Sequence, residues 1–144
     1  MDVSAIASRA LEHGLNSIED IDGPLTPFTL VVDANPDLRN RTMALTRHAA
    51  ETLEECLASA QDSILPGADK TLYAIAWDGY VTVDGRKWDA ILVEAGSAEA
   101  SDGILMAQRY EGTTVGLFKK RRRNVAVGAP LHVGLVASRL WSEG

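Results

Sequence analysis

TLYAIAWDGYVTVDGRKWDAILVEA, residues 71–95, is the stretch of this chain that decides the fold. It is typical of two long strands joined at Asp84-Gly85, because both central positions of a two-residue hairpin turn need a positive φ. A turn of that length places Val81 directly opposite Trp88. One side of the hairpin, the first face, is then almost entirely apolar. It carries Tyr73, Ile75, Trp77, Val81, Val83, Trp88, Ala90 and Leu92.

The other side of the hairpin, the second face, is polar near the turn and apolar further back. A three-residue turn would shift the pairing by one residue and place polar side chains such as Lys87 and Asp89 among the apolar ones. Because such a slip turns a whole strand over, the cleaner separation favours the two-residue turn. We expect Trp77 and Trp88 to be buried together on the first face. The second face carries Asp78, Tyr80, Thr82, Lys87 and Asp89 near the turn, and Ala74, Ala76, Ile91 and Val93 behind them.

Composition predicts a single soluble domain spanning residues 1–144. Hydrophobic residues make up 46% of the chain, which is enough for a proper core. No apolar run approaches the roughly 18 residues of a membrane helix, and residues 1–14 lack the basic and apolar regions of a secretion signal. Cys56 is the only cysteine, which excludes an internal disulfide and fits a reducing compartment. We therefore expect a cytoplasmic protein with no membrane association.

Two helices are predicted, one at the N-terminus and one before the central hairpin. Apolar residues recur with helical spacing over residues 3–11, with Asp2 available as the N-cap and Gly14 at the position of a C′ glycine. The second helix covers about residues 52–65. A capping-box sequence marks its start, with Thr52 as the N-cap, and a Pro-Gly pair marks its end.

The segment between these helices has two interpretations. The β-branched content of residues 27–33 predicts a strand. Polar and apolar residues alternate over residues 41–47, which favours a second strand that returns antiparallel to the first. A rival interpretation makes residues 37–64 one long helix. The capping box favours two strands followed by a helix, because such a sequence belongs at a helix start.

The C-terminal part of the chain is predicted to add strands. Residues 104–111 form a strand, Gly112-Thr113 a turn and residues 114–119 another strand. Residues 125–141 are ambiguous, because glycines and a proline weaken a helix there without excluding one. The whole is an α+β fold. It comprises a mostly antiparallel sheet of about five to six strands around the central hairpin, one helix packed on a face and a short N-terminal helix.

One polar cluster with predictable geometry lies on the second face near the turn. Tyr80 is opposite Asp89, Asp78 is diagonal to Asp89, and Lys87 is opposite Thr82 beside them. Opposite residues are about 5 Å apart at Cβ and diagonal residues about 7–8 Å apart. Acid–base chemistry would need burial or like charge to separate the two carboxylate pKa values, whereas Lys87 between them would keep both ionised. The simpler interpretation is a solvated face with cross-strand ion pairs. The candidate catalytic or ligand-binding residues are Asp78, Tyr80, Lys87 and Asp89.

No metal, cofactor or nucleophile signature accompanies this cluster. The three histidines lack the paired spacing of zinc sites, and Cys56 falls on the apolar stripe of the second helix beside acidic residues. Residues 19–23 have part of a calcium-loop pattern but not its full ligand set. No glycine-rich phosphate loop or nucleophile-elbow serine is present. We predict no bound metal and no cofactor, and a non-catalytic protein is favoured over an enzyme.

Five of the fourteen basic residues form one run near the C-terminus. The net charge is −6, and without the run the remaining 9 basic and 20 acidic residues give −11. Such a run can neutralise phosphates, but the acidic body repels a polyanion and few aromatic residues accompany the run. We rank protection of an edge strand first, contact with a protein partner second and weak nucleic-acid contact third. The run consists of Lys119, Lys120, Arg121, Arg122 and Arg123.

Two functions of different classes follow. The first is a non-catalytic oligomeric or protein-interaction domain, in which the apolar rear of the second face, with Ile91 and Val93, forms a homodimer interface. The alternative is a small-molecule-binding domain or hydrolase that uses the polar cluster. A cleft over the second face would favour the alternative, whereas a second copy of the sheet packed there would favour the dimer. A terminal segment of the same chain is the main rival for covering the apolar area.

Overall fold

The computed structural model describes residues 1–21, 24–33, 43–66, 70–116 and 121–143, with only the backbone of Val115, Arg121 and Arg122. These residues form two helices and seven strands. In chain order the elements are α1 (Val3–Ile18), β1 (Phe28–Asp33), β2 (Met43–Arg47), α2 (Leu53–Asp62), β3 (Lys70–Val83), β4 (Arg86–Ser97), β5 (Asp102–Val115), β6 (Arg121–Ala126) and β7 (Leu131–Ala137).

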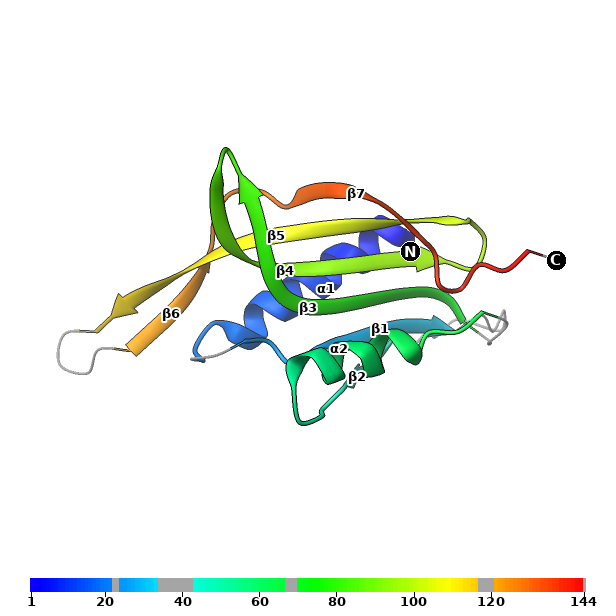
Figure 1. Ribbon diagram of the computed structural model, residues 1–144, viewed down its shortest axis with the longest axis horizontal. Helices are drawn as coiled ribbons and strands as arrows, with labels where there is room; N and C mark the ends of the chain where they lie inside the picture. Colours follow the sequence, from blue (N-terminus) through cyan, green and yellow to red (C-terminus); the bar gives the residue numbers. More distant parts are fainter. Residues whose placement is uncertain (22–23, 34–42, 67–69, 117–120, 144) are drawn as a thin grey trace.

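The strands form one antiparallel sheet in the order β2-β1-β3-β4-β5 (Figure 1). Beyond β4, β5 has two partners. Its first half pairs with β7 and its second half with β6. The α+β class and the antiparallel sheet predicted from the sequence are confirmed, with seven described strands where about five to six were expected.

The central hairpin has the predicted register. Val81 pairs with Trp88 across β3 and β4, and the turn residues Asp84 and Gly85 have φ values of 51° and 80°. Positive φ at both positions is the geometry of a two-residue type I′ turn. Trp77 and Trp88 therefore share the first face, but the expectation that both are buried was wrong, because each is only half-buried.

The segment before the hairpin folds as two strands and a helix. β2 pairs antiparallel with β1, so the single long helix over residues 37–64 is wrong within the described part of that range. α2 begins where the capping box predicted, and the Thr52 hydroxyl accepts a hydrogen bond from the Glu55 amide at 3.1 Å. Ala60 and Ile64 then pack against the first face.

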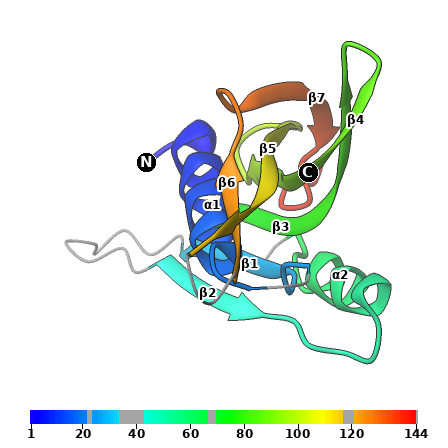
Figure 2. The same cartoon turned by 90° about the vertical axis from the view of Figure 1, so that its left-hand side faces the viewer.

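α1 covers the apolar rear of the second face (Figure 2). Asp2 is its N-cap as predicted, accepting from the Ala5 amide at 2.8 Å. The helix does not end at Gly14, because its apolar stripe continues to Ile18. Gly14 instead allows a close approach to the sheet. A Cβ there would lie 3.0 Å from Cγ2 of Ile91.

Three expectations for the C-terminal part were wrong or open. β5 runs without a turn through Gly112, because that residue pairs with Asn124 of β6. The separate strand expected over residues 114–119 is wrong in its described part, because Thr114 and Val115 continue β5, and Arg121–Arg123 of the basic run begin β6. β7 settles the ambiguity of residues 125–141 in favour of a strand, since pairing with β5 supplies the backbone hydrogen bonds that a helix would otherwise have made.

The chain after β7 lies within the curl of the sheet, against the first face (Figure 2). Arg139 donates two hydrogen bonds to the buried Glu94 carboxylate on β4, from Nε at 2.7 Å and from Nη2 at 3.2 Å. The Tyr73 hydroxyl donates to the same carboxylate at 2.6 Å. Leu140 is buried beside this group. The C-terminal segment is therefore an integral part of the core.

Candidate binding cleft

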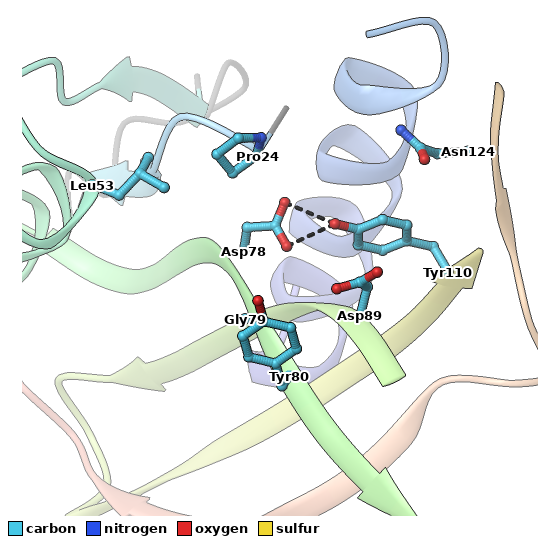
Figure 3. Close-up of a pocket in the computed structure, with 8 residues that line it drawn as sticks. All are labelled: Pro24, Leu53, Asp78, Gly79, Tyr80, Asp89, Tyr110 and Asn124. Atoms are coloured by element: carbon cyan, nitrogen blue, oxygen red, sulfur yellow. Dashed lines mark hydrogen bonds between the residues drawn. The ribbon is translucent and has the colours of Figure 1, made fainter. Parts of the chain in front are cut away.

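The sheet divides at the end of the pairing between β4 and β5. Ala90 and Arg109 form the last pair, after which the central hairpin and the β5–β6 pair extend as separate arms (Figure 1). Between the arms, on the second face, lies a cleft of about 440 Å³. We call it the binding cleft. Its lining residues are Pro24, Leu53, Asp78, Gly79, Tyr80, Asp89, Tyr110 and Asn124 (Figure 3).

Asp78 joins three separate parts of the chain at the base of the binding cleft. Its carboxylate accepts from the Tyr110 hydroxyl, at 2.8 Å to Oδ1 and 3.0 Å to Oδ2 (Figure 3), and from the Leu25 amide at 2.9 Å. Burial raises the pKa of Asp78 above its ordinary value, the Leu25 and Tyr110 hydrogen bonds oppose that rise, and the charge of Asp89 adds to it. The carboxylate is thus held in place but keeps part of its accepting capacity.

Asp89 presents a second carboxylate to the binding cleft. It lies opposite Tyr80 in the hairpin register, as predicted, and is half-buried. Within the described part of the chain it makes no hydrogen bond or ion pair. Tyr80 is 62% exposed, so its ring forms an open wall of the cleft.

Lys87 does not lie between the two carboxylates, and that prediction was wrong. Its ammonium nitrogen is 4.0 Å from the centroid of the Tyr80 ring, a cation–π contact. No ion pair joins it to Asp78 or Asp89 among the described residues. The position of Lys87 diagonal to Tyr80 allows the long side chain to lie over the ring instead.

Asn124 closes the far side of the binding cleft and attaches β6 to the end of α1. Its side-chain Nδ2 donates to the carbonyl oxygens of Ile18 at 2.6 Å and Ile21 at 3.2 Å. Its backbone N–H donates to the carbonyl oxygen of Glu19 at 2.9 Å. These bonds satisfy carbonyl groups that the helix end leaves unpaired. Asn124 Oδ1, by contrast, is buried and has no hydrogen-bond partner among the described residues.

The sequence alone identified one wall of the binding cleft and missed the other. Asp78, Tyr80 and Asp89 were candidates because the hairpin register is readable from local sequence. Tyr110 was missed although it lies on the same face as Asp89, one position beyond the last β4–β5 pair. Asn124 followed the basic run without any signal of its own. Neither residue can be placed before the register of β5 and the path of β6 are known.

The proposed interface residues are not on the surface. Ile91 and Val93 are both 0% exposed because α1 packs over them, so they cannot contact a second copy. This is the outcome in which a segment of the same chain covers the apolar area. Dimerisation itself stays a prediction, but Ile91 and Val93 no longer support it.

The basic run is only partly described. Lys119 and Lys120 lie outside the described residues, and Arg121 and Arg122 are placed by backbone in β6. Among the described strands β6 pairs only with β5, so this part of the run is on an edge strand. Arg123 forms an ion pair with Glu19 of the same chain. That contact ties β6 to α1 and leaves Arg123 less available for a phosphate.

The described residues show no metal centre, since no group of three or more histidine, cysteine, aspartate or glutamate side chains is placed to hold an ion. Within the same residues, neither helix has the length and apolar character needed to cross a membrane. Comparison with protein-family models, curated proteins and solved structures finds no match to this chain.

Proposed function

We propose that this protein binds a small molecule in the binding cleft. The observation that carries the proposal is a cavity of about 440 Å³ over the polar half of the second face, where the sequence placed its candidate residues. Ligand sites are typically concave, with volumes of about 300–1,000 Å³, and combine apolar or aromatic walls with a few converging polar groups. Here Leu53 and Tyr80 supply apolar and aromatic wall, and Asp78 and Asp89 supply the polar groups.

Binding without covalent catalysis is the simpler function for this lining. The described lining residues include no serine, cysteine, histidine or lysine, which are the usual nucleophiles and bases of covalent catalysis. Asp78 is already hydrogen-bonded to Tyr110 and Leu25, which suits a positioning role. Hydrolysis by the two carboxylates stays a prediction, because it requires a bound substrate to define the reacting atoms.

A fragment screen by ¹H–¹⁵N NMR tests the proposal. We expect some fragments to shift the amides of Gly79, Tyr80 and Asp89, and to lose this effect in a Leu53→Trp variant that fills the cleft mouth. Leu53 is 45% exposed, so the larger ring can be accommodated. Leu65→Trp, at a 60% exposed position that does not line the cleft, is the matched control. A screen in which no fragment shifts the cleft amides would reject small-molecule binding.

Edge strand β7 favours a second candidate function, a homodimeric interaction module. Among the described strands β7 pairs only with β5, which leaves its other edge open. Val133 and Leu135 are 48% and 69% exposed there, and β7 contains no charged residue or proline to discourage pairing. Sedimentation equilibrium distinguishes the 15.5 kDa monomer from a dimer of twice that mass. A homodimeric module requires that the wild type is a dimer and that Leu135→Asp dissociates it without unfolding the monomer. A wild type that sediments as a monomer excludes this function.

A further inference from the structure

We propose that the ligand of the binding cleft is a small organic cation whose primary ammonium group lies between Asp78 and Asp89. This inference rests on the proposed small-molecule function and adds the chemical class of the ligand. It follows from the charge of the lining, from acceptors that have no donor, and from the aromatic walls.

The charge of the binding cleft is not balanced within its lining. Asp78 and Asp89 both contribute carboxylates, and none of the described lining residues is cationic. Lys87, the basic residue of the predicted cluster, lies over the Tyr80 ring and pairs with neither carboxylate. Two like charges that face one partly enclosed space repel each other, and a cation between them relieves that repulsion.

The unsatisfied polar atoms of the binding cleft are acceptors. The Asp89 carboxylate has no donor within the described part of the chain. Asn124 is only 9% exposed and its Oδ1 has no partner there either. Its orientation is fixed, because Nδ2 donates to Ile18 and Ile21 of the α1 terminus. Figure 3 shows Oδ1 on the side nearer Tyr110, which also lines the cleft. A buried acceptor without a donor is costly, and a ligand rich in N–H groups supplies one.

An ammonium ion fits this site better than a metal ion does. Three carboxylate, imidazole or thiolate groups are not assembled here among the described residues, and two of the acceptor positions of Asp78 are taken by Tyr110 and Leu25. An ammonium has three donors and accepts a mixed set of carboxylate and amide oxygens. The exposed ring of Tyr80 can contact the alkyl part of such a ligand.

Three probes of equal length test the ligand class. n-Butylammonium, n-butanol and butyrate differ mainly in the charge of one end group. We expect n-butylammonium, titrated into the millimolar range, to shift the NMR signals of Gly79, Tyr80 and Asp89. The dissociation constant from this titration should be at least about tenfold lower than that of n-butanol. Butyrate should leave these signals unchanged.

Matched charge variants locate the effect. Asp89→Asn should weaken n-butylammonium binding by about tenfold and leave n-butanol unaffected. Asp84→Asn removes the same charge at the hairpin turn, where φ is 51° and asparagine is tolerated, and should bind like the wild type. If n-butanol or butyrate binds as well as the cation, the cation class is wrong while small-molecule binding stands. If fragments fail to bind at all, both proposals are wrong.

Discussion

Replacement of Arg139 by methionine should destabilise the protein by about 2–3 kcal/mol, because it leaves the Glu94 carboxylate buried without its cation. The Glu94 side chain is 8% exposed and the Arg139 side chain 33% exposed. Methionine keeps most of the apolar length of arginine, so the change removes charge and hydrogen bonds rather than packing volume.

The magnitude follows from what remains around Glu94. Two charge-assisted hydrogen bonds from Arg139 are lost, and the bond from the Tyr73 hydroxyl at 2.6 Å is kept. Loss of one partner of a fully buried ion pair costs about 3–5 kcal/mol. The expected loss of stability is smaller than that, because water can reach the third of the Arg139 side chain that is exposed. For a chain of this size the melting temperature should fall by about 4–12 °C.

Urea unfolding of a double-mutant cycle measures this interaction. The four proteins are the wild type, Arg139→Met, Glu94→Gln and the double variant, and the coupling energy between the two positions should exceed about 1 kcal/mol. Glu111→Gln serves as the control, because it breaks an exposed ion pair with Arg86. The Arg86 side chain is 60% exposed and the Glu111 side chain 52% exposed. This control substitution should cost less than about 1 kcal/mol. A coupling energy near zero would refute a stabilising role for the Arg139–Glu94 ion pair.

Three further predictions concern the helix cap, the first face and the binding cleft. Thr52→Ala should lower the free energy of unfolding by about 1 kcal/mol through loss of the α2 N-cap, and equal urea midpoints for variant and wild type would exclude the cap. Trp88→Ala should cost about 1–3 kcal/mol, less than a fully buried aromatic, because the ring is half-buried beneath the Arg86 guanidinium, 3.6 Å from its centroid; a urea-derived loss above about 4 kcal/mol would contradict this. Because the pKa of Asp78 is raised in the folded protein, at a pH between the ordinary and the raised pKa the folded state keeps a proton that the unfolded state has released. The stability of the wild type relative to Asp78→Asn should therefore fall as the pH rises from the ordinary aspartate pKa through the raised one, and urea titrations showing the opposite slope would reject the assignment.

Local chemistry made several elements of this protein readable from sequence. The Asp84-Gly85 turn and the alternation of polar and apolar residues on both sides of it determined the register of β3 and β4, because each constraint acts between residues close in the chain. The caps at Asp2 and Thr52 act within one helical turn and were predicted for the same reason.

Which element covers which face was decided only by the tertiary structure. Both faces of the hairpin have apolar area, and the sequence allowed either α1 or a second copy to cover the second face. α1 does so because Gly14 lets it approach Ile91 closely, a contact between residues far apart in the chain. The same limit applies to the binding cleft. Asp78 meets Tyr110 across 32 residues of sequence, and Asn124 reaches Ile18 across 106. Periodicity and turn chemistry describe only neighbours, whereas these contacts depend on where the sheet divides between β4 and β5.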